Sequence, residues 1–295
     1  MLYMQSVSKR QQTSEPVSRV NLHALPGKLY VLVGAKGSGK STVLKLAAGL
    51  IAPDSGRIII DGHSMDNKNN KRKRYNLVGY VAAVPEMAPG LRLMEYMEFY
   101  GHIYGKYGLS ARERCREVLQ MVRLEKRSDV LMGNLPKSAL RLAQVARALI
   151  HKPKLLLLDY PFLGMEEKEQ EIMDEILKKL HDEVAIVQTC ESFADAVSYC
   201  DSLGLMEEGS IVMQGSRDAV LERVRGKSPI YMEIRSDPET AAVAIRKQEA
   251  VVNYTRRDNQ FRIWFSGDMD GEARLLKSLI DEGVEINSFY RGIDV

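Results

Sequence analysis

Apolar runs alternate with amphipathic segments along most of the chain. Five runs are apolar and bounded by turn residues or by an acid, which is typical of strands buried in a sheet. They cover residues 28–35, 55–62, 78–84, 155–158 and 184–189. Segments with apolar residues at helical spacing lie between them, at 40–51, 139–150 and 165–183. This alternation predicts an α/β core with a mainly parallel sheet.

Two regions depart from the alternation. From about residue 85 to 138 the pattern is helical, which predicts a helical insertion into the core. After a change in composition near 225–229, strand and helix patterns follow in the order βαββαβ, the split-βαβ or ferredoxin-like pattern. We therefore expect two domains, residues 1–225 and 229–295, the second being a small packing or dimerisation module. Its aromatic residues are interpreted as sheet-packing side chains: Tyr231, Trp264 and Tyr290.

Composition narrows the class of protein only a little. The 295 residues are 45% hydrophobic and 27% charged, which is ordinary for a globular protein. A net charge of +3 does not by itself indicate a nucleic-acid partner, and three cysteines without a CxxC pair fit a reducing cytosol. The apolar runs are shorter than the ~20 residues that span a bilayer, and we expect no signal peptide. A role at a membrane would need another chain to supply the span.

A glycine-rich segment between the first buried strand and the first helix has the P-loop spacing G-x-x-x-x-G-K-S. Its glycines let backbone N–H groups point at phosphate oxygens, and the helix adds the positive end of its dipole. Lys40 is expected to reach the β- and γ-phosphates, and the Ser41 hydroxyl to help hold Mg²⁺. The expected nucleotide-binding residues are Gly34, Ala35, Lys36, Gly37, Ser38, Gly39, Lys40, Ser41 and Thr42.

The second magnesium ligand of a P-loop site is a carboxylate at the end of an apolar strand. Asp159 follows four consecutive leucines and meets this requirement. Ser41 and Asp159 are therefore the predicted metal ligands. ATP and Mg²⁺ are the expected cofactors.

Over roughly residues 1–225 the chain resembles the nucleotide-binding subunit of an ABC transporter. The similarity is carried by GAKGSGKSTVLKLAAGLIAPDSGRIIIDG, MEYMEFYGHIYG, ARALIHKPKLLLLDYP and CDSLGLMEEGSIVMQG. The long interval between Lys40 and Asp159, filled by helical residues, also fits that family. The C-terminal segment resembles the extension of ABC-2-type exporter ATPases, although FYRGIDV lacks the Leu-Glu-Asp-x-x-Phe-like ending. The implied fold is an α/β P-loop NTPase of the ABC ATPase type, with a helical insertion and a C-terminal ferredoxin-like α+β domain.

The resemblance also implies partners. In that family two such domains pair head to tail, each ATP lying between one P-loop and the partner's signature motif. Integral-membrane subunits sit on the helical insertion. The chain is therefore expected to be cytoplasmic, peripheral on the cytosolic face of a membrane, and paired with an identical or different nucleotide-binding subunit. No nucleic-acid partner is expected.

Residues that the family uses for hydrolysis are replaced in this chain. The glutamate after the strand aspartate becomes Tyr160, the glutamine after the earlier strand becomes Ala83, and the histidine of the next strand becomes Cys190. The adenine-contacting aromatic aligns with Gln11. The signature motif, which would face the partner's nucleotide, becomes Leu135, Pro136, Lys137, Ser138 and Ala139.

These replacements predict binding with weak hydrolysis. A tyrosine with a pKa of ~10 is a protonated donor at neutral pH and cannot replace a carboxylate base, and losing a general base costs ~10²–10⁴ in rate. Pro136 has neither the hydroxyl nor the backbone N–H of a signature serine. We expect a degenerate half of a transporter, whose own hydrolysis of ATP is low or absent.

Two alternatives remain open at this point. The chain could be an active transport ATPase that uses Glu86 or Glu191, which lie close to the replaced positions. It could also be a soluble ABC-type ATP-binding protein that regulates a process other than transport.

Overall fold

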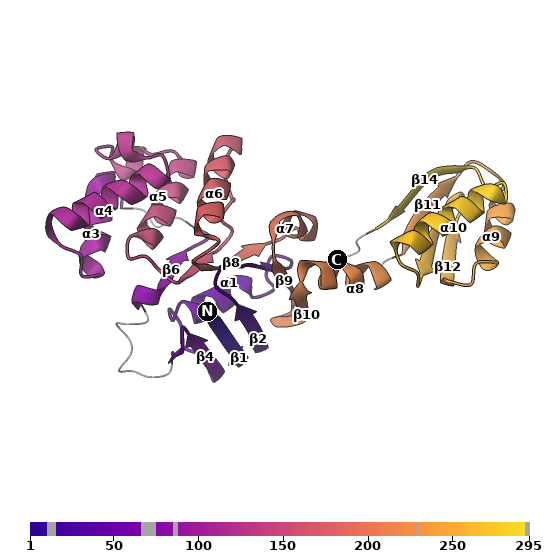
Figure 1. Ribbon diagram of the computed structural model, residues 1–295, viewed down its shortest axis with the longest axis horizontal. Coiled ribbons are helices and arrows are strands. Elements are labelled where there is room, and N and C mark those ends of the chain that lie inside the picture. Colours follow the sequence, from indigo (N-terminus) through magenta and orange to yellow (C-terminus); the bar gives the residue numbers. More distant parts are fainter. Residues whose placement is uncertain (11–15, 66–74, 85–87, 228, 293–295) are drawn as a thin grey trace. The chain divides into compact units, whose positions relative to one another are not determined.

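The computed structural model places most of the chain in two compact units, Met1–Ser216 and Arg217–Val295 (Figure 1). The residues that it describes are 1–10, 16–65, 75–84, 88–227 and 229–292. Gln11 and Glu86, which the sequence analysis singled out, lie outside these ranges. Each unit has its own buried core.

A six-stranded sheet forms the centre of the first unit, in the order β10-β9-β3-β8-β7-β6. Its strands are β3 (Leu29–Val33), β6 (Val78–Val81), β7 (Leu155–Leu158), β8 (Ala185–Cys190), β9 (Ser202–Glu207) and β10 (Ser210–Ser216). Neighbouring strands from β9 to β6 pair in parallel, whereas β10 pairs antiparallel with β9. The prediction of a mainly parallel sheet is confirmed.

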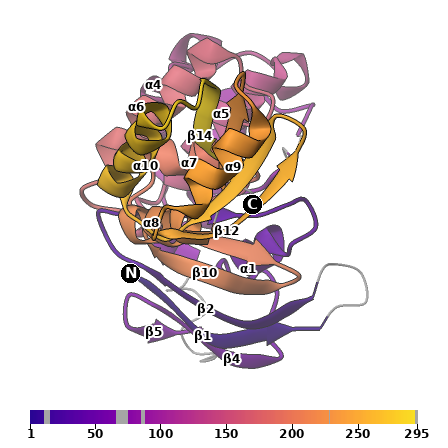
Figure 2. The same cartoon turned by 90° about the vertical axis from the view of Figure 1, so that its right-hand side faces the viewer.

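A second sheet of the first unit was not predicted. It is antiparallel, in the order β2-β1-β4-β5, and these strands lie together in Figure 2. Its strands are β1 (Leu2–Lys9), β2 (Val17–Ala24), β4 (Ser55–Ile60) and β5 (His63–Ser64). The strand predicted over 55–62 is β4 and belongs here because Ile58 and Ile60 pair with Met4 and Leu2 of β1.

Helix α1 (Lys40–Ala47) joins the two sheets in one hydrophobic core. Its residues Val43, Leu44 and Leu46 are fully buried. They share that core with Ile58 and Ile60 of the antiparallel sheet and with leucines and valines of the parallel strands. The helix is thereby held at the carboxyl end of β3, where it continues the P-loop.

Helices fill the interval between β6 and β7 and pack against one another, and the last of them also contacts β6 (Figure 1). They are α3 (Leu93–Ile103), α4 (Gly108–Met121) and α5 (Lys137–Leu149), with 3₁₀ turns η2 (Glu125–Arg127) and η3 (Met132–Asn134). Two further helices, α6 (Glu167–Leu180) and α7 (Phe193–Tyr199), connect β7 to β8 and β8 to β9. Among the described residues, no helix has the length and apolar character needed to cross a membrane.

The second unit contains a four-stranded antiparallel sheet in the order β12-β13-β11-β14. Its elements are α8 (Arg217–Lys227), β11 (Ile230–Ile234), α9 (Pro238–Arg246), β12 (Val251–Arg257), β13 (Gln260–Phe265), α10 (Met269–Asp281) and β14 (Ile286–Arg291). Contacts group α8 with this unit, whereas the sequence analysis drew the boundary at 225–229. The assignment of functional domains stays a prediction.

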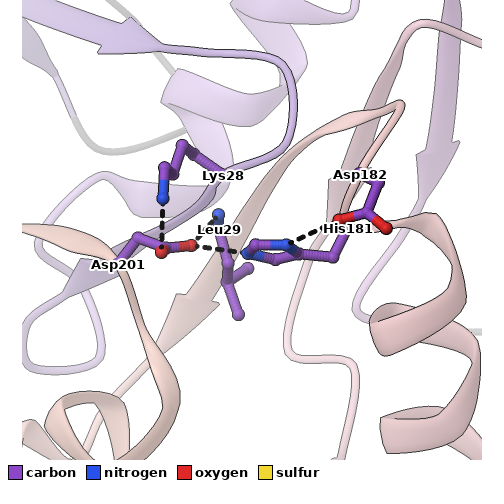
Figure 3. A network of polar contacts seen from close by, with 5 residues as sticks. All are labelled: Lys28, Leu29, His181, Asp182 and Asp201. Atoms are coloured by element: carbon purple, nitrogen blue, oxygen red, sulfur yellow. Dashed lines mark hydrogen bonds and ion pairs between the residues drawn. The ribbon is translucent and has the colours of Figure 1, made fainter.

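A polar network fixes the amino end of β3, opposite the P-loop (Figure 3). The Asp201 carboxylate accepts from the Leu29 backbone N–H at 2.8 Å and from the Lys28 ammonium at 3.1 Å, and His181 Nε2 lies 2.9 Å from it. Burial opposes its charge, but the hydrogen bonds from Leu29, His181 and Lys28 outweigh burial and lower the pKa of Asp201. The network joins the starts of β3 and β9 to the end of α6.

Candidate functional site

The predicted P-loop forms the turn between β3 and α1. Residues 34–39 make the turn, and Lys40, Ser41 and Thr42 begin the helix. A Cβ atom on Gly34 would lie 2.3 Å from the carbonyl oxygen of Met206, so the backbone can approach only with glycine there. Gly39 has a φ of 96°, a left-handed conformation that glycine adopts without strain.

The Lys40 side chain lies along the inside of this turn. Its ammonium donates to the carbonyl oxygens of Gly34 and Ala35, each at 2.7 Å, and to the Ser38 hydroxyl at 3.2 Å. The side chain is 2% exposed. A buried ammonium held by neutral oxygens is poised to exchange these contacts for phosphate oxygens, because a charged acceptor forms a stronger hydrogen bond.

The two predicted magnesium ligands lie next to each other. The Ser41 hydroxyl donates to Asp159 Oδ1 at 3.0 Å, and the Thr189 hydroxyl donates to the same oxygen at 2.8 Å. Asp159 is 2% exposed and its backbone N–H donates to Val81, which fixes the carboxylate at the ends of β7 and β6. Magnesium prefers hard oxygen ligands and is usually held by one or two carboxylates together with substrate phosphates. A hydroxyl and a carboxylate beside a phosphate loop therefore suit it.

A cleft of about 660 Å³ opens at the other end of the first unit, but a larger one adjoins the P-loop. This second cleft, which we call the P-loop cleft, has a volume of about 1250 Å³. It is lined by Lys40 and Ser41 and also by the three positions at which the sequence predicts replaced hydrolytic residues: Ala83, Tyr160 and Cys190. The structure thus brings both predicted groups of residues to one place.

The replaced positions present little acid–base chemistry to the cleft. The Tyr160 backbone N–H donates to the Thr189 hydroxyl at 2.8 Å, and its ring centroid lies 5.4 Å from the Lys40 ammonium. Cys190 Sγ donates to the Ser192 carbonyl oxygen at 3.3 Å, and burial raises the pKa of this thiol. Cys190 is therefore neutral at pH 7 and offers a phosphate only a weak donor.

The predicted signature segment lies at the start of α5 and does not line the P-loop cleft among the described residues. Pro136 is the N-cap of α5 and Lys137, its first residue, is exposed. Ser138 donates to Glu169 of α6 at 3.1 Å, whereas Leu135 and Ala139 are buried. Of these residues, Lys137 is the cation available to solvent.

Arg141 is a site residue that the sequence analysis missed. It is 2% exposed, and its guanidinium donates to the carbonyl oxygens of Ala82 and Ala83 at the end of β6. Burial lowers the pKa of Arg141, and the charge of Asp159 opposes that shift. Arg141 therefore ties α5 to the wall of the P-loop cleft. Its position among apolar residues of α5 is the signal that was present in the sequence.

Comparison with known proteins relates the chain to one family. Residues 17–163 match the family model described as ABC transporter. The probable sulfate/thiosulfate import ATP-binding protein CysA of Chlorella vulgaris is 31% identical over 217 residues, 73% of this chain and 91% of that protein. The linearmycin resistance ATP-binding protein LnrL of Bacillus subtilis is 26% identical over 264 residues, 89% of this chain and 84% of that protein.

A solved structure shares the fold of the first unit. It is a dimeric ATP-binding cassette, MJ0796, in a post-hydrolysis state with ADP and phosphate. The TM-score is 0.66 at 24% identity, and the match covers 74% of this chain and 99% of the cassette. The fold is that of an ABC ATPase within the P-loop NTPases. With the P-loop geometry and the curated relatives, these findings show that the chain is an ATP-binding protein of the ABC transporter family.

Proposed function

We propose that this chain is a degenerate nucleotide-binding subunit of an ABC exporter, which holds Mg-ATP and hydrolyses it weakly. The observation that carries the proposal is the composition of the P-loop cleft. Lys40 and Ser41 line this cleft and Ser41 donates to Asp159, whereas Tyr160 and Cys190 line it where the family resemblance predicts the catalytic base and the γ-phosphate contact.

Binding would rest on three side chains of this protein. Lys40 would donate to the β- and γ-phosphates, and Ser41 and Asp159 would hold Mg²⁺ together with phosphate oxygens. Bound magnesium would supply charge neutralisation between those phosphates. Thr189 keeps Asp159 oriented, because its hydroxyl donates to the carboxylate while accepting from the Tyr160 backbone.

Hydrolysis would lack a base and a γ-phosphate contact. The phenol of Tyr160 is a donor at neutral pH, and Ala83 has no polar side-chain atom. Each missing electrostatic contact typically costs ~10²–10³ in rate, and a missing base ~10²–10⁴. Such losses do not multiply fully, yet together they leave little turnover.

Export is supported by the second unit. The alignment with the linearmycin resistance protein spans 264 residues, more than the 216 residues of the first unit, so it extends into the second. The second unit has βαββαβ order after α8 and the sheet order β12-β13-β11-β14. We propose that it is a ferredoxin-like accessory domain, as in exporter ATPases of the ABC-2 type.

A membrane subunit would dock on the helical insertion. Helices α3 and α4 and the turn between them expose large apolar side chains at 54–82% of their surface, namely Phe99, Ile103, Tyr107 and Leu109. Exposed apolar groups gathered on neighbouring segments are typical of interaction surfaces. Changing Ile103 and Leu109 to aspartate should abolish co-purification with the membrane subunit while ATP binding persists. Unchanged co-purification would contradict this docking site and the peripheral location on the cytosolic face.

A second nucleotide-binding subunit would pair across the signature segment. Lys137 is exposed at the first position of α5, where it could offer positive charge to the partner's nucleotide. Lys137→Ala should weaken ATP-driven association of the two subunits. Association that is unchanged by this substitution would contradict the role of Lys137 but leave pairing itself intact.

An active ATPase remains the alternative function, because Glu191 also lines the P-loop cleft and carries a carboxylate. The two functions differ in steady-state phosphate release by the complex with its membrane subunit. Under the degenerate-half proposal, Glu191→Gln leaves release unchanged within about twofold, since general-base loss costs far more, ~10²–10⁴. A loss of that size would favour the active ATPase.

A further inference from the structure

One face of the C-terminal sheet is left uncovered by α9 and α10. The core of the second unit takes alternate residues of the strands, such as Ile230, Met232 and Ile263, together with residues of both helices. Successive side chains of a strand point to opposite faces. The remaining residues of β11 and β13, including Tyr231 and Arg262, therefore lie on the opposite face.

Strand pairing arranges that opposite face in two rows across the sheet. The first row is formed by Tyr290, Tyr231, Arg262 and Thr255, which pair in that order from β14 to β12. The second row is formed by Ser288, Glu233, Gln260 and Arg257. All eight residues line one hollow of about 450 Å³, which we call the sheet-face hollow. Pockets of about 300–1,000 Å³ are the size that holds small molecules.

The first row offers flat surfaces for stacking. The rings of Tyr231 and Tyr290 stack with centroids 5.6 Å apart and planes 16° apart. The Arg262 guanidinium lies 5.2 Å from the Tyr231 ring centroid. Glycine at 292 leaves room for the Tyr231 ring, because a Cβ there would lie 2.2 Å from a ring carbon. Tyr290 is 58% exposed, so its outer face is open to a ligand.

The charges of the hollow favour an anion. Arg262 and Arg257 belong to adjacent rows and are both exposed, and neither has an ion-pair partner within the described ranges. Arg256, by contrast, pairs with Glu239 of α9 at 2.7 Å. The single carboxylate of the hollow, Glu233, accepts from the Asn287 amide at 3.0 Å. Guanidinium groups pair with carboxylate or phosphate through two parallel hydrogen bonds.

We propose that the sheet-face hollow binds a small planar anion, a conjugated ring that carries a carboxylate or a phosphate. The ring stacks on Tyr290 and beside Arg262, and the anionic group pairs with Arg257 and Arg262. A single-stranded nucleic acid is disfavoured because Glu233 stands in the middle of the second row, where a continuing phosphate chain would meet its charge. The residues of this site differ from those of the P-loop cleft, and the proposal does not rest on the proposed function.

The chain provides its own probe for this site. Trp264 is the single tryptophan of the protein and lies two residues from Arg262 on the same strand and face, about 7 Å away at the usual rise per residue. The full chain is titrated with 4-nitrobenzoate and with 4-nitrophenyl phosphate while tryptophan emission is recorded. Neutral 4-nitrobenzamide has the same ring without the charge. We expect saturable quenching by one or both anions and no saturation with the amide.

Variants locate the binding. Arg262→Ala should weaken the binding of the anion about 10-fold or more, since hydrogen bonds to charged groups contribute ~1.5–3 kcal/mol and each 1.4 kcal/mol is tenfold. Arg262→Lys keeps the charge but loses the planar guanidinium, so its affinity for the anion should lie between those of the unsubstituted chain and Arg262→Ala. Arg246→Ala is the matched control because Arg246 also lies over a tyrosine ring, that of Tyr254 at 5.7 Å, outside the hollow. It should bind the anions like the unsubstituted chain.

Four results would overturn the proposal. The first is no saturable quenching by either anion, and the second is equal saturation with the neutral amide. The third is tighter binding of octauridylate than of either small anion, which would indicate a nucleic-acid surface. Equal effects of Arg262→Ala and Arg246→Ala would likewise place the binding elsewhere. Thermal unfolding of each variant confirms that the second unit is folded.

Discussion

The P-loop cleft has two sides with different chemistry. On one side, Lys40 and Ser41 begin α1 and line the cleft, and the Ser41 hydroxyl donates to Asp159, which follows β7. On the other side, Ala83, which follows β6, offers a methyl group. Cys190, the last residue of β8, offers a neutral thiol. Binding and hydrolysis of the nucleotide depend on different side chains, even where these are neighbours, as Asp159 and Tyr160 are after β7. One can therefore be kept while the other is lost.

Loss of the Lys40 ammonium should have the largest effect, a weaker binding of ATP. Lys40→Ala should weaken ATP binding about 10- to 100-fold, because hydrogen bonds to charged groups contribute ~1.5–3 kcal/mol. Lys45→Ala is the control, since Lys45 lies on the same helix and lines the same cleft but is exposed. It should change affinity by less than about twofold, as expected for an exposed charge. Equal losses from both substitutions in equilibrium binding would contradict the P-loop geometry.

Arg141, which ties α5 to the wall of the P-loop cleft, should contribute to the stability of the fold. Arg141→Met leaves the carbonyl oxygens of Ala82 and Ala83 without their buried donors and should lower the free energy of unfolding by about 2–3 kcal/mol. Arg123→Met removes an exposed ion pair with Glu175 and should cost less than about 1 kcal/mol. Urea unfolding followed by circular dichroism measures both. A cost for Arg141 no larger than for Arg123 would show that the guanidinium is dispensable.

The polar network around Asp201, at the amino end of β3, should contribute stability that depends on pH. Asp201→Asn should cost about 1–2 kcal/mol at pH 7 because a charged acceptor of three hydrogen bonds is lost. The pKa of Asp201 is lowered in the folded chain, so its contribution is present above the ordinary value of ~3.9 and is lost as the pH falls through the lower folded pKa. The difference in free energy of unfolding between the variant and the unsubstituted chain should therefore become smaller at acidic pH.

Asp182→Asn is the matched control for this network. Asp182 carries the same group 3.8 Å from His181, but it is 95% exposed. Its substitution should leave the free energy of unfolding unchanged at every pH. A pH-independent cost for Asp201→Asn would contradict the role assigned to its charge.

The smallest effect is expected for a single repair of the hydrolytic side. Tyr160→Glu restores one carboxylate, but Ala83, Cys190 and the signature segment remain replaced, each missing contact being worth ~10²–10³ in rate. Phosphate release should therefore rise by less than about tenfold. The control is the same substitution combined with Lys40→Ala, which should remove any gain. Release at the rate of an active transport ATPase would refute the account of several losses.

Much of the first unit could be predicted from the sequence because its strands and P-loop are local patterns. The strand over Leu2–Lys9 could not, since a register shift between Met4 and Val7 breaks the alternation that marks a half-buried strand. Arg141 escaped notice for another reason: its partners, Ala82 and Ala83, lie 58 or more residues away. Contacts of that kind depend on the assembled sheet.

In the second unit, too, some features could be predicted from local sequence patterns and others depend on how the strands pair. Its order of strands and helices follows from periodicity, whereas the sheet-face hollow follows from register. Tyr231 and Tyr290 were interpreted as packing residues because alternation does not tell which face a helix will cover. The pairing of β11 with β13 and β14 places them on the face opposite the core. Tyr290 is accordingly exposed rather than packed.

The central claim is that this chain keeps nucleotide binding without efficient hydrolysis. The most direct test measures ATP binding and phosphate release in one preparation of the purified chain with Mg²⁺. The account predicts one ATP bound per chain and turnover at least about a hundredfold below the ~1 s⁻¹ at the low end of typical enzymes. Saturable binding accompanied by turnover on the order of 1 s⁻¹ or faster, abolished by Lys40→Ala, would contradict it.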